Sequence, residues 1–181
     1  FRAPGTGPDP AAPALSPAGV PTVPDIRPLA MTDRQIAETI DGYARSARDA
    51  VRAGFDALEI HGAHGYLIDQ FLWAETNRRT DSYGGDAQGR CRFACEVLRA
   101  VRREVGPAMP ILFRFSQWKR HDFEARLAGS PDALAALLQP LSEAGVDVFH
   151  ASTRRFWEPA FPEHGPLCLA GWTRRLTGKP V

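Results

Sequence analysis

The chain has 181 residues, of which 44% are hydrophobic and 24% charged, a composition typical of a folded protein with one core. Its 22 basic and 21 acidic residues give a formal net charge of +1, so no strong field attracts nucleic acid or an anionic membrane. The sequence contains neither an apolar run of about 18 residues nor a signal-peptide pattern, and we therefore expect a cytoplasmic protein without a membrane span.

Three cysteines are present, and Cys91 and Cys95 lie four positions apart in a helical pattern. This is not a disulfide framework, and a reducing compartment is the simpler interpretation. A metal site would need further Cys or His ligands at defined spacing, so we expect none here.

Proline dominates the start of the chain. Half of the sixteen prolines fall between Pro4 and Pro28, where neither a helix nor a central strand can continue through them. We expect residues 1–30 to form a long surface loop or linker and residues 31–181 to belong to one folded domain.

The first strong helix signal covers residues 33–52. Thr32 and Gln35 have capping-box spacing, and apolar residues then recur at helical intervals. Gly54 ends this predicted helix.

Strands and helices alternate after it. Ser130 is a predicted N-cap, with Pro131 in the first helical turn, and Gly145 ends that helix. The predicted elements are a strand at 57–61, a polar loop at 65–89, a helix at 90–104, a strand at 111–115, a helix from 131, a strand at 146–151 and a helix at 169–176. A further strand would begin at Val181.

This alternation predicts an α/β fold with a parallel sheet, either open and doubly wound or closed into a barrel. No G-x-G-x-x-G loop joins a strand to a helix, which argues against a dinucleotide-binding fold. His61, Arg114 and His150 lie on or at the ends of three successive strands, where barrel enzymes place their chemistry. A complete barrel needs eight strands and about 250 residues, so the sequence accounts for roughly half of one.

Residues 61–66 read HGAHGY. Two imidazoles can donate to one substrate oxygen, and the phenol of Tyr66 can deliver a proton, which suits an enolate-like intermediate. Two alternatives stay open: His61 and His64 serve packing or capping, or they bind a metal for hydrolysis, although a third ligand at suitable spacing is missing.

Arg114 places a permanent cation inside an apolar strand. Leu112, Arg114 and Ser116 share one face, and if that face lines a barrel mouth, Arg114 can meet an anionic or electron-rich ligand. A structural salt bridge is the alternative.

Four motifs lie close together: EIHGAHGYLI at 59–68, QFL at 70–72, TNRRTD at 76–81 and YGG at 83–85. Together with Arg92-Phe93, the strand of Arg114 and AGVD at 144–147, they resemble the Old Yellow Enzyme family of FMN-dependent NAD(P)H oxidoreductases. The resemblance covers about residues 30–181 and is most specific between His61 and Gly85.

The resemblance implies a partial (β/α)₈ TIM barrel, roughly its central strands and helices, with FMN at the C-terminal mouth. NAD(P)H would reduce the FMN, and a hydride would pass to a small-molecule alkene or enone. His61 and His64 would be the catalytic pair that binds the substrate oxygen, Tyr66 the catalytic proton donor and Arg114 the cofactor-binding ligand of the flavin ring. Two histidines indicate the xenobiotic-reductase-like or dienoyl-reductase-like branch.

Three loops depart from the family pattern, at 73–75, 86–89 and 116–120, and these changes affect pocket shape. Trp118 and Trp157 could wall the mouth of the site, but aromatic residues on long loops are at least as often packing residues, and we leave both out of the predicted site. The loop at 77–85 is predicted to be structural, with arginines that pin it.

The family holds the flavin phosphate with strands and loops that this sequence lacks. We therefore expect an internal fragment that is catalytic within a full-length parent and inactive alone. The alternative is a non-catalytic truncated barrel remnant or binding protein. The sequence predicts no oligomeric state.

Overall fold

A central parallel sheet organises the computed structural model, which describes residues 13–22 and 28–181. Its strands are β3 (Leu58–His61), β4 (Ile111–Ser116) and β5 (Val148–Ser152), in the order β3-β4-β5. Because strands that are consecutive along the chain are also neighbours in the sheet, these are successive β/α units. The predicted α/β fold with parallel strands is confirmed, although the described residues do not close a barrel.

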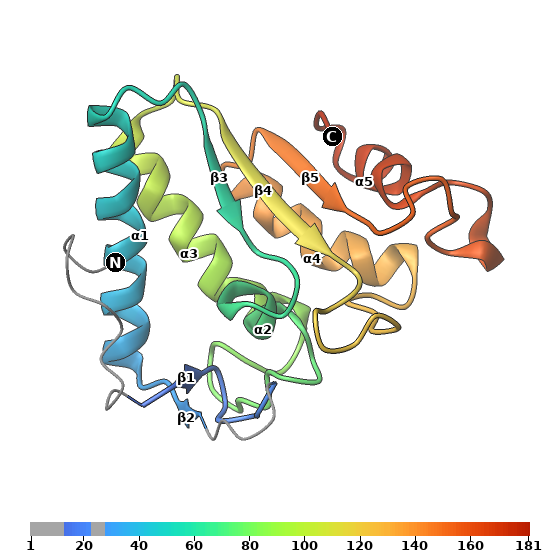
Figure 1. Cartoon of the computed structure of the whole chain (residues 1–181), viewed down its shortest axis with the longest axis horizontal. Helices are drawn as coiled ribbons and strands as arrows, with labels where there is room; N and C mark the ends of the chain where they lie inside the picture. Colours follow the sequence, from blue (N-terminus) through green and yellow to red (C-terminus); the bar gives the residue numbers. More distant parts are fainter. Residues whose placement is uncertain (1–12, 23–27) are drawn as a thin grey trace.

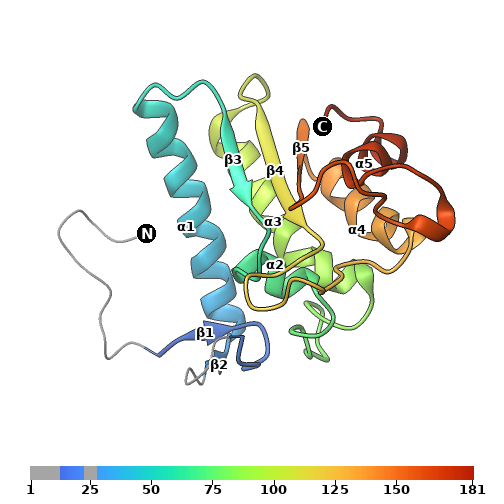
Figure 2. The same ribbon diagram turned by 45° about the vertical axis from the view of Figure 1, so that its right-hand side comes forward.

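The helices lie on one side of this sheet. They are α1 (Asp33–Arg52), α2 (Leu67–Leu72), α3 (Ala87–Val105), α4 (Pro131–Glu143) and α5 (Leu169–Thr177), with a short 3-10 helix at Pro162–His164. Helices α3 and α4 lie behind the strands in Figure 1, while α1 packs against α3 and α5 against α4. In Figures 1 and 2, the opposite face of the sheet carries none of the described helices.

Side-chain alternation in β4 separates the core from the open face. Ile111, Phe113 and Phe115 are buried toward the helices, as a strand's period of two requires. Arg114 is only half-buried and projects from the opposite face, in register with His61 on one side and His150 on the other. The sheet therefore presents a row of polar side chains on the face that the helices leave open.

Two elements differ from the sequence prediction. Helix α2 lies inside the predicted polar loop at 65–89, and four of its six residues are buried. Helix α3 begins at Ala87 rather than 90, because the Asp86 side chain caps it by accepting from the Gly89 backbone N–H at 2.9 Å.

The observed bounds of the strands also differ from the predicted ones by one or two residues. Strand β5 begins at Val148 rather than 146, because the Asp147 carboxylate accepts from Arg102 and from the backbone N–H of Ile111. At the C-terminus, Phe149 donates its backbone N–H to the Pro180 carbonyl at 3.0 Å. The chain therefore already lies beside β5 at Pro180, one residue before Val181, where the sequence predicted that a further strand begins.

Two short strands lie within the predicted N-terminal loop. β1 (Leu15–Ser16) and β2 (Leu29–Ala30) pair in parallel, and backbone bonds from Leu29 to Ala14 and from Met31 to Ser16 extend the ladder. Residues 1–12 and 23–27 of that predicted loop lie outside the described residues. The prolines limit the ladder to two residues in each strand.

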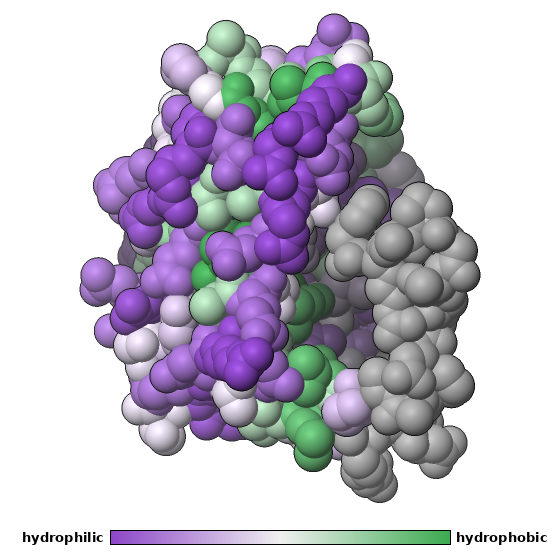
Figure 3. Space-filling view, turned by 90° about the vertical axis from the view of Figure 1, so that its left-hand side faces the viewer, coloured by the Kyte–Doolittle hydropathy of each residue, from purple (hydrophilic) through white to green (hydrophobic). Residues whose placement is uncertain are grey.

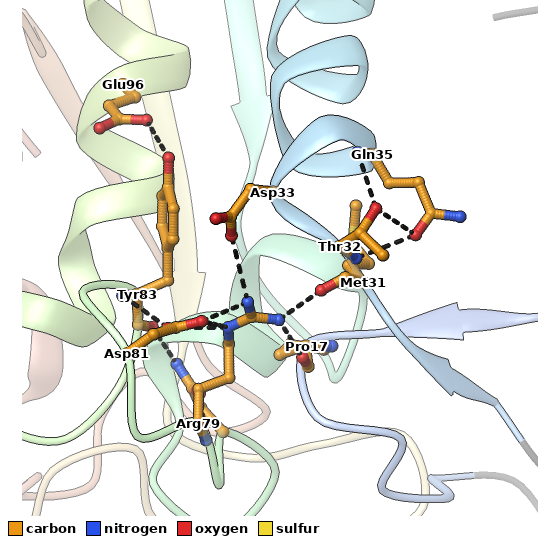
Figure 4. Close-up of polar contacts among 10 residues, drawn as sticks. Pro17, Met31, Thr32, Asp33, Gln35, Arg79, Asp81, Tyr83 and Glu96 are labelled. Carbon is orange, nitrogen blue, oxygen red and sulfur yellow. Dashed lines mark hydrogen bonds and ion pairs between the residues drawn. The ribbon is translucent and has the colours of Figure 1, made fainter.

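Arg79 anchors this ladder to the rest of the domain (Figure 4). Its side chain is 9% exposed, and its guanidinium donates to the carbonyls of Pro17 at 2.7 Å and Met31 at 2.6 Å. It also bonds the Asp81 carboxylate and lies 3.6 Å from that of Asp33. The prediction that arginines pin the 77–85 loop is confirmed for Arg79.

Helix α1 has the predicted bounds and the predicted cap. Gln35 donates its backbone N–H to the Thr32 hydroxyl, and its side-chain oxygen accepts from the Thr32 backbone N–H at 2.9 Å (Figure 4).

Figure 3 shows the side of the molecule that lies on the left in Figure 1, and hydrophilic residues dominate its surface among the described residues. Among the described residues, no helix is both long and apolar enough to cross a membrane.

We predict that Arg79→Ala lowers the free energy of unfolding by about 2–4 kcal/mol, because it leaves two carbonyls without their donor and removes the ion pair with Asp81. The control is Arg78→Ala, whose side chain is 62% exposed and pairs only with Glu75 among the described residues. That change should cost no more than about 0.5 kcal/mol. Urea denaturation followed by circular dichroism measures both, and equal losses would contradict the anchoring role.

Candidate active site

A strained loop brings the HGAHGY segment to the carboxyl ends of the strands. Gly62 donates its backbone N–H to the Arg114 carbonyl at 2.8 Å, and a Cβ at Gly62 would lie 2.4 Å from the Phe113 ring. Only glycine therefore allows the backbone at position 62 to pass this close to Phe113 of β4. His64 then adopts a φ of 62° and donates its backbone N–H to the Ser116 hydroxyl at 3.0 Å. Backbone of this kind persists where surrounding contacts hold it, and it is frequent at functional sites.

A buried ion pair fixes this loop to the segment that follows β4. Lys119 Nζ lies 2.8 Å from Asp69 Oδ1, and neither side chain has exposed surface. The other carboxylate oxygen of Asp69 accepts from the Gly65 backbone N–H, and Lys119 also donates to the Ser116 carbonyl. Burial raises the pKa of Asp69 and lowers the pKa of Lys119, while the opposite charge of each partner favours the ionised pair.

Neither member of this pair was predicted as a site residue from the sequence. A single carboxylate within the apolar run of α2, and a lysine following a buried strand, were the available signals. Each is a buried charge that requires a partner, but the partner of Asp69 lies far along the chain at Lys119.

The structure brings His61, His64 and Tyr66 together. The ring centroids of His61 and His64 are 5.2 Å apart, and those of His61 and Tyr66 are 5.3 Å apart. Burial, followed by the nearby charge of Arg114, lowers the pKa of His61 and lowers that of His64 to about 4. Both imidazoles are therefore neutral at pH 7, and each offers one N–H donor.

Arg114 lies beside these three residues, and not all of its N–H donors have a partner among the described residues. Its Nη2 donates to the Ser152 hydroxyl at 3.2 Å, and its buried Nε has no hydrogen-bond partner among the described residues. No described carboxylate pairs with it, so the structural salt bridge considered from the sequence is absent in this part of the chain. Arg114 retains donors for another group.

Ser152 connects Arg114 to His64. It is the last residue of β5, its Oγ lies 2.8 Å from His64 Nε2, and its exposed fraction is 7%. Because the predicted strand ended at 151, Ser152 was not among the predicted site residues. A serine at the carboxyl end of a parallel strand was the signal available.

The hydrogen bonds of Ser152 favour one tautomer of His64. A guanidinium only donates, so the Ser152 oxygen accepts from Arg114, and among the described residues His64 Nε2 is the one acceptor within reach of the Ser152 hydrogen. Since His64 is neutral, we infer that its single ring proton is on Nδ1. That N–H is then available to a ligand.

The two tryptophans occupy different environments. Trp118 stacks on His64 with ring centroids 4.3 Å apart, so it lies directly beside the predicted site residues although the sequence prediction left it out of the site. Trp157 is 66% exposed and contacts Phe156 edge to face at 5.2 Å. Trp118 also borders a pocket of about 220 Å³ between the segments that follow β4 and β5.

His150 does not join the cluster of His61, His64 and Tyr66. Although it lies in register with Arg114, its Nδ1 is 2.7 Å from a Glu59 carboxylate oxygen. Across the described residues, no three His, Cys, Asp or Glu side chains gather in a metal-binding arrangement.

Comparison with known sequences gives a family match. The profile of the NADH:flavin oxidoreductase / NADH oxidase family matches residues 7–160. The chain is 37% identical over 129 residues to chanoclavine-I aldehyde reductase of Penicillium roqueforti, covering 71% of this chain and 34% of that protein. It is 44% identical over 104 residues to 12-oxophytodienoate reductase 2 of Arabidopsis thaliana, covering 51% and 28%.

A third relative, from Leishmania infantum, is described as a probable flavin mononucleotide-dependent alkene reductase. The identity is 54% over 79 residues, which cover 44% of this chain and 22% of that protein. The chain thus spans about a third or less of the length of these three relatives.

We predict that Ser152→Ala changes the tautomer of His64, because Nε2 loses its donor and becomes free to carry the proton. Nitrogen-15 NMR at pH 7 should show a proton on Nδ1 in the wild type and a larger Nε2–H population in the variant. Ser82→Ala, at an exposed serine, is the control. An Nε2–H form in the wild type, or no change in Ser152→Ala, would contradict this tautomer assignment.

Proposed function

Because this chain belongs to the NADH:flavin oxidoreductase / NADH oxidase family, we propose that it contributes the substrate-binding and proton-donating side of an FMN-dependent reductase. The proposed substrates are small activated alkenes such as enones, with NAD(P)H as the reductant. We further propose that residues 31–181 are the central units of a (β/α)₈ barrel. The observation that carries the proposal is the convergence of His61, His64 and Tyr66 beside an unsatisfied Arg114.

The residues present fit a flavin ring. Arg114 combines a permanent charge with a buried Nε–H that lacks a described partner, on the face of the sheet that the helices leave open. Electron-rich atoms such as flavin N1 and O2 are suitable acceptors for such a group. When bound, FMN supplies hydride-transfer chemistry, and in this proposal Arg114 holds its ring.

His61 and His64 are suited to bind the substrate oxygen. Neutral imidazoles donate without adding a charge that would have to be desolvated, and the inferred Nδ1–H of His64 is not used by Ser152. As the alkene accepts a hydride at its β-carbon, negative charge grows on the conjugated oxygen. Two donors fixed in advance stabilise that charge more than they stabilise the ground state.

Tyr66 is suited to complete the reaction. Its ring lies against His61, and the residue is 45% exposed. The phenol delivers a proton to the α-carbon of the enolate, and its exposure allows the phenolate to regain a proton from solvent. Trp118 stacks on the His64 ring and limits the orientations that this ring can adopt.

We expect Arg114→Ala to raise the dissociation constant for FMN about 10- to 100-fold, because a charge-assisted hydrogen bond is lost. Arg114→Lys should restore only part of the affinity, since it keeps the charge without the planar fork. Fluorescence titration of FMN with the complete gene product measures this, and Arg92→Ala on α3 is the control. Unchanged affinity would remove Arg114 from the flavin site, and no uptake of FMN by the wild type would favour the non-catalytic alternative.

Substitutions in the cluster should separate oxygen binding from proton delivery. Replacing His61 and His64 by Ala should slow alkene reduction by about 10²–10³-fold, the scale of lost oxyanion donors. Tyr66→Phe should slow enone reduction by about 10²-fold and spare quinone reduction, because a quinone needs no proton at carbon. Stopped-flow measurements with both acceptors test this, and equal slowing of the two by Tyr66→Phe would exclude Tyr66 as the proton donor.

A further inference from the structure

Arg120 makes a contact with Tyr66 that the proposed mechanism has not used. Its Nη1 donates to the phenolic oxygen at 2.6 Å, and its backbone N–H donates to the His64 carbonyl at 3.2 Å. The guanidinium carbon lies 5.9 Å from the centre of the Tyr66 ring. Arg120 therefore touches the HGAHGY segment at two points, through its side chain and its backbone.

The backbone of Arg120 is held in place by its neighbours. Lys119, immediately before it, is the buried partner of Asp69. A tight turn follows, in which Lys119 donates its backbone N–H to the Asp122 carbonyl at 2.8 Å and Asp122 donates back to Lys119 at 3.1 Å. The contact with Tyr66 is thus made from a fixed backbone, although both side chains reach the surface.

The direction of the hydrogen bond matters for the chemistry. A guanidinium has no acceptor, so the phenolic oxygen accepts and keeps its own hydrogen. Within the described part of the chain, no other group bonds the Tyr66 hydroxyl. The hydrogen is therefore free for a substrate while the oxygen is held, which is the arrangement that a proton donor needs.

We propose that Arg120 is a positioning residue that orients the Tyr66 hydroxyl toward the substrate and stabilises the phenolate left by proton transfer. The inference rests on the proposed function, in which Tyr66 protonates the α-carbon. In that step the phenolic O–H bond breaks and its electron pair stays on oxygen. A C–H bond forms with the electron pair of the enolate, and the guanidinium of Arg120 faces the new negative charge.

Two other roles for Arg120 make different predictions. If Arg120 only stabilised the fold, its loss would impair folding and would slow the reduction of every acceptor equally. A direct ligand for the phosphates of a nicotinamide nucleotide would slow reduction of the protein by NAD(P)H. Positioning of Tyr66 alone predicts a loss confined to acceptors that need a proton on carbon.

The experiment uses the complete gene product loaded with FMN and compares Arg120→Gln, Arg120→Lys, Tyr66→Phe and the Tyr66→Phe/Arg120→Gln double variant. Arg120→Gln should slow enone reduction about tenfold and leave quinone reduction within about twofold, as expected for impaired general-acid catalysis. Lysine should restore part of the rate, because it returns a charged donor. In the Tyr66→Phe background, Arg120→Gln should cost nothing further.

A matched control and a second readout accompany these rates. Arg78→Gln, at an exposed arginine paired with Glu75, should leave the reduction rates of both the enone and the quinone unchanged. Without substrate, the NMR signals of the Tyr66 ring should shift in Arg120→Gln and stay in place in Arg78→Gln, which reports the contact in solution. FMN content confirms that each variant is folded.

Three results would overturn the inference while leaving the proton donor intact: equal slowing of both acceptors, a defect in reduction by NAD(P)H alone, or a full tenfold loss that persists in the Tyr66→Phe background. If Tyr66→Phe slows the enone and Arg120→Gln does not, only the role of Arg120 fails. If Tyr66→Phe itself reduces the enone at the wild-type rate, the proposed proton donor and this inference fail together.

Discussion

Asp69 and Lys119 form an ion pair without exposed surface, and the geometry of the site depends on it. Either charge alone would cost several kcal/mol to bury, so the segments after β3 and β4 can pack only when both charges are in place. The remaining bonds of the pair reach Gly65 and Ser116, which extends the constraint into both backbones. The position of one segment therefore determines that of the other, and the site forms as a unit.

A permanently charged guanidinium and a neutral imidazole lie close together at this site. Arg114 keeps a permanent charge, while burial and that same charge keep His64 neutral. Ser152 lies between the two side chains: it accepts a hydrogen bond from Arg114 and bonds His64 Nε2, so the imidazole is oriented while it stays neutral. A cation suited to an electron-rich ring and a neutral donor suited to a carbonyl can then lie side by side.

Elements with local signals were predictable from sequence, and those defined by distant contacts were not. The capping box of Thr32 and Gln35 lies within the helix that it starts, and α1 has its predicted bounds. Helix α2 is held by tertiary burial, and Asp69 within it resembled a loop residue. Motif resemblance correctly identified the family and suggested His61, His64, Tyr66 and Arg114 as site residues, whereas Ser152 and Trp118 depend on partners that only the fold supplies.

The segment after β4 alternates between buried and accessible positions, with Lys119 buried between Trp118 and Arg120. Its backbone is set by the residue in the middle, so the two flanking positions can change without displacing the loop. Substitutions at residues 118 and 120 should therefore change the surroundings of His64 and Tyr66 more than they change the path of the backbone.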